Sequence, residues 1–213
     1  MRAIVQYVVM MACSFFFVSC ERWSPRGEYK VIGTATINGK EYVHMTHRGW
    51  NSEFNSVVLT FYPHYNVFDI GTLLQDKNLG NVVDHEYRII FFVTTQRPEI
   101  LKNIPYKIEY NKSLEANNYI PIEVERTLVL DKSKIISSNA NNGIAIVVNI
   151  KTNEARSMEG YFVIHELDMQ NKFCKGGYML KTPSTSDKEE LTIYGKFEAE
   201  LFKSDFRFLN IKR

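Results

Sequence analysis

Alternation of apolar and polar residues is the feature of this sequence that most constrains its fold. Between residues 191 and 201 every second residue, from Leu191 to Leu201, is apolar or glycine, and most of the residues between them are polar. A period of two is typical of a β-strand with one buried face. Residues 144–150 repeat the pattern, with Ile144, Ile146 and Val148 on one side. The alternation predicts an antiparallel sheet of half-buried strands.

A hairpin signal stands near the start of this pattern. The dipeptide Asn38-Gly39 separates two strand-like segments, residues 31–37 and 41–45. Asn and Gly tolerate the positive φ angles of a type I′ turn, which joins two strands by two residues. We therefore expect the domain to open with a β-hairpin.

Further segments rich in β-branched and aromatic residues complete the strand prediction, and no window of 12 residues has a convincing helical period. These strands are expected at residues 56–62, 87–95, 127–131, 160–167, 173–181 and 206–211, with short edge strands at 106–110 and 119–122. The predicted fold is all-β, an antiparallel β-sandwich of about ten strands with little helix. A β-barrel is the alternative, because alternation does not separate the two.

Length and charge limit the organisation and the partners. The chain has 213 residues, and residues 30–213 are predicted to form a single β domain with one core. Lys and Arg number 26 against 24 Asp and Glu, a net charge of +2. This balance does not favour nucleic acid or a basic membrane-binding surface.

The N-terminus carries a targeting pattern. Arg2 precedes a run of 16 mostly apolar residues, positions 3–18, which is shorter than a membrane-spanning helix requires. The residues Phe17-Val18-Ser19-Cys20 resemble the lipobox of bacterial lipoproteins. The resemblance implies a signal peptide at 1–19, a lipid on Cys20, a tether over 20–29 and attachment to the cell envelope, at the outer membrane on its periplasmic or surface face. A plain secretory signal cut near Ser19 and an uncleaved anchor are the alternatives.

The sequence offers no constellation for catalysis or for binding a metal or cofactor. It has no GxSxG elbow, and the lone Cys174 in a predicted strand is typical of a small buried hydrophobe. His44 and His47 have a ligand-like spacing, but on a strand these positions point to opposite faces. Acidic residues such as Asp76 and Glu86 include no pair that the sequence singles out. We therefore expect no catalytic residue, no metal and no cofactor.

Aromatic residues in two predicted loops are the candidates for a ligand site. Trp50 follows the first hairpin, and Tyr62, His64 and Tyr65 surround Pro63 after the next strand. Exposed rings beside polar groups can stack on and hydrogen-bond a sugar. Packing between sheets is the alternative role, above all for Trp50.

The N-terminal pattern together with the opening hairpin is similar to that of small uncharacterised β-rich lipoproteins of Bacteroides-type bacteria. The resemblance implies an envelope location and a β domain and supplies no functional residue. The favoured function is a non-enzymatic binding or interaction module for a glycan or protein ligand. The alternatives are a structural, adhesin-like subunit resembling lipoprotein pilins, and an unrecognised hydrolase.

Overall fold

The described part of the chain is built from β-strands. The computed structural model describes residues 28–48, 53–62, 67–79, 84–94, 102–117, 142–168, 170–200 and 206–208. Two 3-10 turns, η3 (Lys77–Leu79) and η4 (Lys112–Leu114), are the helical segments of these ranges. The strands are β1 (Glu28–Ile37), β2 (Lys40–Arg48), β3 (Glu53–Asn55), β4 (Val57–Tyr62), β5 (Val67–Asp76), β6 (His85–Thr94), β7 (Tyr106–Ile108), β8 (Asn142–Asn149), β9 (Glu154–Asp168), β10 (Phe173–Lys181), β11 (Thr192–Glu200) and β12 (Phe206–Phe208).

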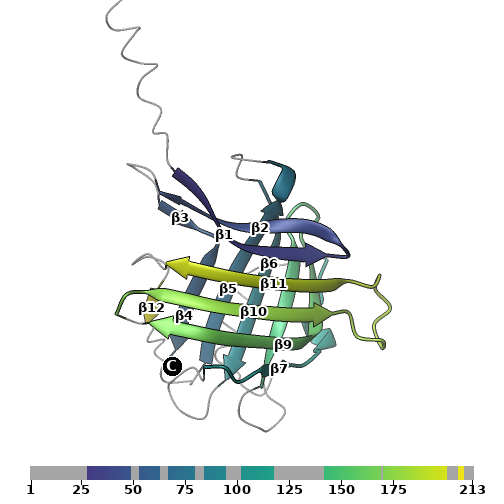
Figure 1. Ribbon diagram of the computed structural model, residues 1–213. Helices are drawn as coiled ribbons and strands as arrows, with labels where there is room; N and C mark the ends of the chain where they lie inside the picture. The colour runs from purple at the N-terminus through teal and green to yellow at the C-terminus, as the bar shows by residue number, and fades with distance from the viewer. Residues whose placement is uncertain are drawn as a thin grey trace, which may run out of the picture.

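These strands form a closed, flattened ring. Their hydrogen-bonded order is β12-β4-β5-β6-β8-β7-β9-β10-β11-β1-β2-β3. The additional pairing β5–β2 closes the ring, and β8 also pairs directly with β9. In Figure 1 a front layer of β9, β10, β11, β1 and β2 runs crosswise over a back layer of β4, β5, β6 and β8. The all-β prediction is confirmed, and the two packed layers make the ring sandwich-like rather than a regular barrel.

Strands pass from one layer to the other at two corners. The first residues of β9 pair with β8, up to Met158, and from Glu159 onward β9 pairs with β10. Gly160 has a φ of 149°, and a Cβ there would run into the carbonyl oxygen of Met179. Glycine at this position therefore allows the bend. At the opposite corner β2 pairs with β5 through Tyr42 and Val43.

The opening hairpin forms as predicted. Asn38 and Gly39 have φ angles of 47° and 83°, the positive values of the two central residues of a type I′ turn. The hairpin is longer than expected, because β1 begins at Glu28 and β2 extends to Arg48.

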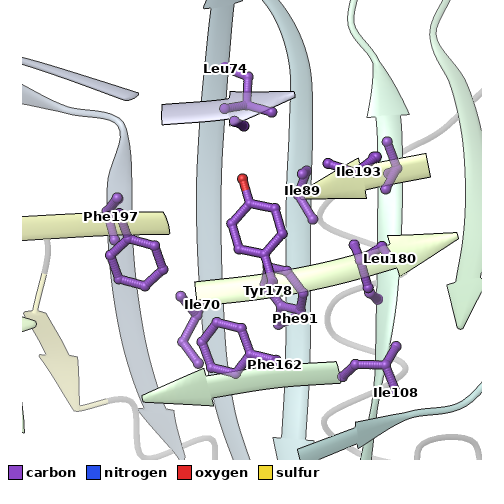
Figure 2. Packing of buried hydrophobic residues seen from close by; sticks show 14 of the residues in the cluster. Ile70, Leu74, Ile89, Phe91, Ile108, Phe162, Tyr178, Leu180, Ile193 and Phe197 are labelled. Atoms are coloured by element: carbon purple, nitrogen blue, oxygen red, sulfur yellow. The ribbon is translucent and has the colours of Figure 1, made fainter. Parts of the chain in front are cut away.

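The main core fills the space between the layers. Figure 2 shows Phe91, Phe162 and Tyr178 close together in this interior, and their rings lie 4.5 Å (Phe91 to Phe162) and 5.2 Å (Phe91 to Tyr178) apart. Tyr178 lies over Gly195, where any Cβ would collide with its ring. The glycine thus makes room for a large side chain of the neighbouring strand.

A second buried cluster lies on the outer side of the back layer and corrects one prediction. Residues 144–150 were predicted to be half-buried, but both faces of β8 are buried. Ala145 and Val147 belong to the main core, whereas Ile144 and Ile146 pack in the outer cluster. Leu114 of η4 is part of that outer cluster, so the segment around η4 contributes its cover.

The predicted strands that fall on described residues are all present, and two strands were missed. The short β3 and the ten-residue β5 had no predicted counterpart. The predicted strands at 119–122 and 127–131 lie outside the described residues. None of the described segments is a helix with the length and apolarity of a membrane span.

Candidate binding pocket

A pocket opens at the end of the ring where the β1–β2 turn lies. It has a volume of about 430 Å³, and we call it the hairpin pocket. Its apolar lining consists of Ile37, Val147 and Leu191, and Leu191 packs against the main core. Its polar and aromatic lining consists of Asn38, Lys40, Tyr42, Glu86, Tyr87, Asn149, Glu154, Arg156 and Glu189. The pocket thus combines an apolar base with polar walls contributed by five separate segments of the chain.

Two tyrosines form the aromatic part of the hairpin pocket. The rings of Tyr42 and Tyr87 meet edge to face with centroids 5.5 Å apart. The ammonium of Lys40 lies 4.9 Å from the centroid of the Tyr42 ring, within the range of a cation–π contact. Burial raises the pKa of Tyr42 to about 12, so its phenol stays protonated at neutral pH.

Lys40 joins the aromatic pair to two carboxylates. Its Nζ lies 2.8 Å from Asp76 Oδ2 and 3.3 Å from Glu86 Oε2. The hydrogen bond to Asp76, followed by one to Tyr42, raises the pKa of Lys40, and the same contact with Lys40 lowers the pKa of Asp76. Two acidic residues that the sequence did not single out are therefore brought together around one cation.

The opposite wall is held by a second ion cluster. Glu154 Oε1 lies 3.2 Å from Arg156 Nε and 3.1 Å from Lys188 Nζ. Burial alone would raise the pKa of Glu154, but hydrogen bonds from Lys188 and Arg156 outweigh it and lower that pKa. The wall carries charges of both signs that already satisfy one another.

Hydrogen bonds fix the rim of the pocket before any ligand arrives. The side-chain oxygen of Asn38 accepts from Thr192 N at 2.8 Å, and its Nδ2 donates to Glu190 O at 3.0 Å. Arg156 Nη1 donates to Glu189 O at 3.1 Å. The β1–β2 turn and β9 are thereby tied to the loop between β10 and β11, and such preorganisation lowers the entropy lost on binding.

This arrangement can bind a polar molecule. The cations beside Asp76 and Glu154 lower the pKa of these two carboxyl groups, so both are ionised at neutral pH. The pocket offers an aromatic surface with amide, carboxylate and cationic groups in fixed positions. Such groups recognise a polar molecule by direct hydrogen bonds.

The site residues predicted from the sequence are the lipidation site Cys20 and four candidate ligand contacts. Cys20, Trp50, His64 and Tyr65 lie outside the described residues. Tyr62 ends β4, but its side chain also lies outside them. These five assignments remain predictions.

The two histidines with a ligand-like spacing, His44 and His47, lie in different surroundings. His44 is fully buried between the layers, and its Nδ1 donates to Leu73 O at 3.2 Å. Its Nε2 therefore accepts from the Tyr178 hydroxyl at 3.0 Å, and burial lowers the pKa of His44 to about 4. His47 instead packs against Tyr29, with centroids 4.4 Å apart. Among the described residues no three His, Cys, Asp or Glu side chains gather in a metal-binding group.

Cys174 is buried, as predicted. Its side chain belongs to the main core, and burial raises the pKa of its thiol to about 12. A thiol in this environment is held in its unreactive protonated form.

Sequence reasoning missed the residues of the hairpin pocket. Lys40, Glu86, Asn149 and Glu154 stand at strand ends, next to turns, and are spread over more than 100 positions. The one usable signal was the Asn38-Gly39 turn, which fixes where the adjacent strand begins. No family model, curated protein or solved structure matches the chain.

Proposed function

We propose that this chain is a lipid-anchored protein of the bacterial cell envelope whose domain binds a saccharide in the hairpin pocket. The observation that carries the proposal is the preorganised pocket of about 430 Å³, in which Tyr42 and Tyr87 lie beside paired charges. A sugar ring has apolar faces and polar edges, so it can contact an aromatic ring while its hydroxyls bond to the surrounding polar groups.

The charges of the pocket favour a ligand that is itself uncharged. Lys40 with Asp76 and Glu86 carries a formal charge of −1, and Glu154 with Arg156 and Lys188 carries +1, so the two clusters together are neutral. The atoms of these side chains that take no part in the ion pairs can still donate or accept hydrogen bonds. The paired charges do not need a charged group from the ligand. Hydroxyl groups satisfy such atoms without bringing a charge into the partly buried site.

The proposed lipid on Cys20 would place this pocket away from the membrane. Seven residues separate Cys20 from Glu28, a span of at most about 30 Å even when extended. β1 begins at Glu28, and its ten residues carry the chain roughly 30 Å further to the Asn38-Gly39 turn. The start of β1 would therefore lie nearest the bilayer, with the hairpin pocket at the distal end.

The test begins with the full chain in detergent micelles on an array of neutral and acidic oligosaccharides. The strongest hit is then titrated by calorimetry against Glu86→Gln, which removes a charge from one wall at nearly constant volume, and Arg156→Gln, which removes the guanidinium from the other. Each should weaken binding about tenfold or more, because a hydrogen bond to a charged group contributes about 1.5–3 kcal/mol.

A matched control variant is Lys175→Gln, which breaks an exposed ion pair with Glu198 (3.1 Å) on a strand end away from the pocket. It should bind as the unmodified chain does. If no oligosaccharide on the array binds, or if the two pocket variants bind like the control, the hairpin pocket is not a saccharide site.

A Cys20→Ala variant tests the anchor separately. We expect it to lose lipid-dependent processing and to leave the membrane fraction after a high-salt wash. Normal processing together with unchanged membrane association would show that the anchor assignment is wrong.

A further inference from the structure

A row of large exposed side chains crosses the outer face of the front layer. Tyr161, Met179 and Tyr194 are 50%, 38% and 53% exposed. Met179 is on β10, between the other two strands. It lies directly opposite Tyr161 on β9 and directly opposite Tyr194 on β11. Directly opposed residues share a face of the sheet, so the three side chains stand side by side. We call them the tyrosine row.

The row belongs to the solvent side and not to the core. The residue next to each member, namely Phe162, Leu180 and Ile193, is fully buried, and a strand alternates its faces. Figure 1 shows β9, β10 and β11 as adjacent strands of the front layer. Exposed large apolar side chains are unremarkable singly, but a contiguous group indicates an interaction surface.

The surface is hollowed at one end of the row. A second pocket of about 450 Å³ is bounded by Tyr161 and Met179 and by residues of β7 and its flank, Lys107, Ile108 and Tyr110. Gly160, which allows the bend in β9, also lines it. The corner between the layers thus creates a recess beside the aromatic ring of Tyr161. From that recess the tyrosine row extends over β10 and β11.

The charges that flank the second pocket neutralise one another. Lys181 lies 3.1 Å from Glu159, and Lys107 lies 3.5 Å from Glu109, all four flanking the second pocket. A surface of paired charges neither attracts a polyanion nor complements an anionic membrane. It complements an uncharged partner that can use both donors and acceptors.

We propose that the tyrosine row, together with the second pocket, binds a neutral polysaccharide chain lying across β9, β10 and β11. Two inter-strand spacings separate Tyr161 from Tyr194, about 10 Å. That distance is comparable to the repeat of a β-linked disaccharide, so alternate sugar rings can stack on the two tyrosines. Met179 lies between them, and its unbranched side chain adapts to the intervening sugar.

This inference does not depend on the hairpin pocket, which uses different residues and a different face. The hairpin pocket is proposed to take a short saccharide, whereas the row requires an extended chain that bridges two rings. Polymers therefore test the row, and variants of the row should leave oligosaccharide binding in the hairpin pocket unchanged.

The experiment is native affinity electrophoresis of the full chain in detergent through gels containing β-glucan, β-mannan or xylan, with polygalacturonate as the charged comparison. At least one neutral polymer should retard the chain, and polygalacturonate should retard it less. Tyr161→Ala with Tyr194→Ala should weaken the retardation at least tenfold. The corresponding Phe substitutions should retain most of it, because stacking needs the ring and not the hydroxyl.

Ile150→Ala serves as the matched control, since Ile150 is a similarly exposed apolar residue (42%) in the turn after β8. Thermal melting of every variant confirms that it is folded. The proposal is overturned if none of the three neutral polymers retards the chain, or if the double Ala variant migrates like the control. It is also overturned if light scattering shows self-association that the double Ala variant abolishes, because the row would then be a contact between copies of this chain.

Discussion

The front and back layers of the ring bury their strands differently. On β10 every second side chain from Cys174 to Leu180 is buried and those between are largely exposed, whereas the last six residues of β6 are all buried. The outer face of the front layer meets solvent, and that of the back layer packs in a second apolar cluster. Alternation in sequence therefore marks a strand with one solvated face, and an uninterrupted apolar run marks a strand covered on both faces.

The strongest test of this comparison is to replace two consecutive residues of β6, one at a time, by alanine. Phe91 belongs to the main core and Phe92 to the outer cluster, and both are fully buried. Phe91→Ala and Phe92→Ala should each lower the free energy of unfolding by about 3–5 kcal/mol, measured by urea denaturation. If Phe92→Ala costs less than about 1 kcal/mol, the back layer has one solvated face after all.

The same experiment on β10 should give unequal results. Leu180 is fully buried in the main core, whereas its neighbour Met179 is exposed on the tyrosine row. Leu180→Ala should cost about 2–5 kcal/mol in urea denaturation, and Met179→Ala less than about 1 kcal/mol. Equal costs at the two positions would contradict a half-buried front layer.

Acidic pH should destabilise the fold through a histidine buried between the layers. Burial lowers the pKa of His44 from 6.5 to about 4 in the folded state, so below pH 6.5 the unfolded state binds the proton first. The free energy of unfolding should therefore fall by about 3 kcal/mol as the pH drops from about 6.5 to about 4. His85, half-buried at the start of β6, also has a pKa lowered by burial and adds a loss of the same sign.

Urea denaturation at a series of pH values separates the two contributions. His44→Gln should remove the larger part of the slope between pH 6.5 and 4.5, and His85→Gln a smaller part. A slope that is unchanged in His44→Gln would show that this imidazole is not held neutral by its burial.

Two glycines sharpen the contrast between a corner and the middle of a strand. Gly160→Ala should cost about 1–3 kcal/mol, because φ is 149° there and the Cβ meets the backbone of β10. At Gly71 on β5 no atom lies within 4 Å of a built Cβ. Gly71→Ala should change stability by no more than about 1 kcal/mol, in the stabilising direction. Thermal melting of both variants checks the difference, and a similar loss at both positions would mean that the bend does not depend on glycine.

How well a strand could be predicted from the sequence depends on whether one of its faces meets solvent. The front strands were recognisable: residues 173–181 were predicted as a strand and are β10 with identical ends, and the alternation of residues 191–200 is that of β11. β5 was missed because Asp69, Gly71 and Thr72 interrupt its apolar run. Asp69 and Thr72 are nonetheless buried and Gly71 is half-buried, and β5 is an inner strand that pairs with β4 on one edge and β6 on the other.

The candidate sites show where sequence reasoning ended. Large rings near turns predict Trp50, Tyr62, His64 and Tyr65 as ligand contacts, and the side chains of all four lie outside the described residues. The hairpin pocket instead joins Lys40 to Glu86, and the tyrosine row joins Tyr161 to Tyr194. Each pair comes from strands that are distant in sequence or separated by a third strand, and a pattern of neighbouring residues does not contain that information.

The sequence by itself determined the local structure of this protein: extended strands from a period of two, and a type I′ hairpin from Asn38-Gly39, whose φ angles few other residues adopt. These outcomes depend on interactions between residues close in the chain. The tertiary structure alone decided that the sheet closes through β2 and β5, that the outer side of β6 and β8 is covered, and which polar side chains meet at the end of the ring. Such pairings depend on which surfaces exclude water together, and that is a property of the assembled layers.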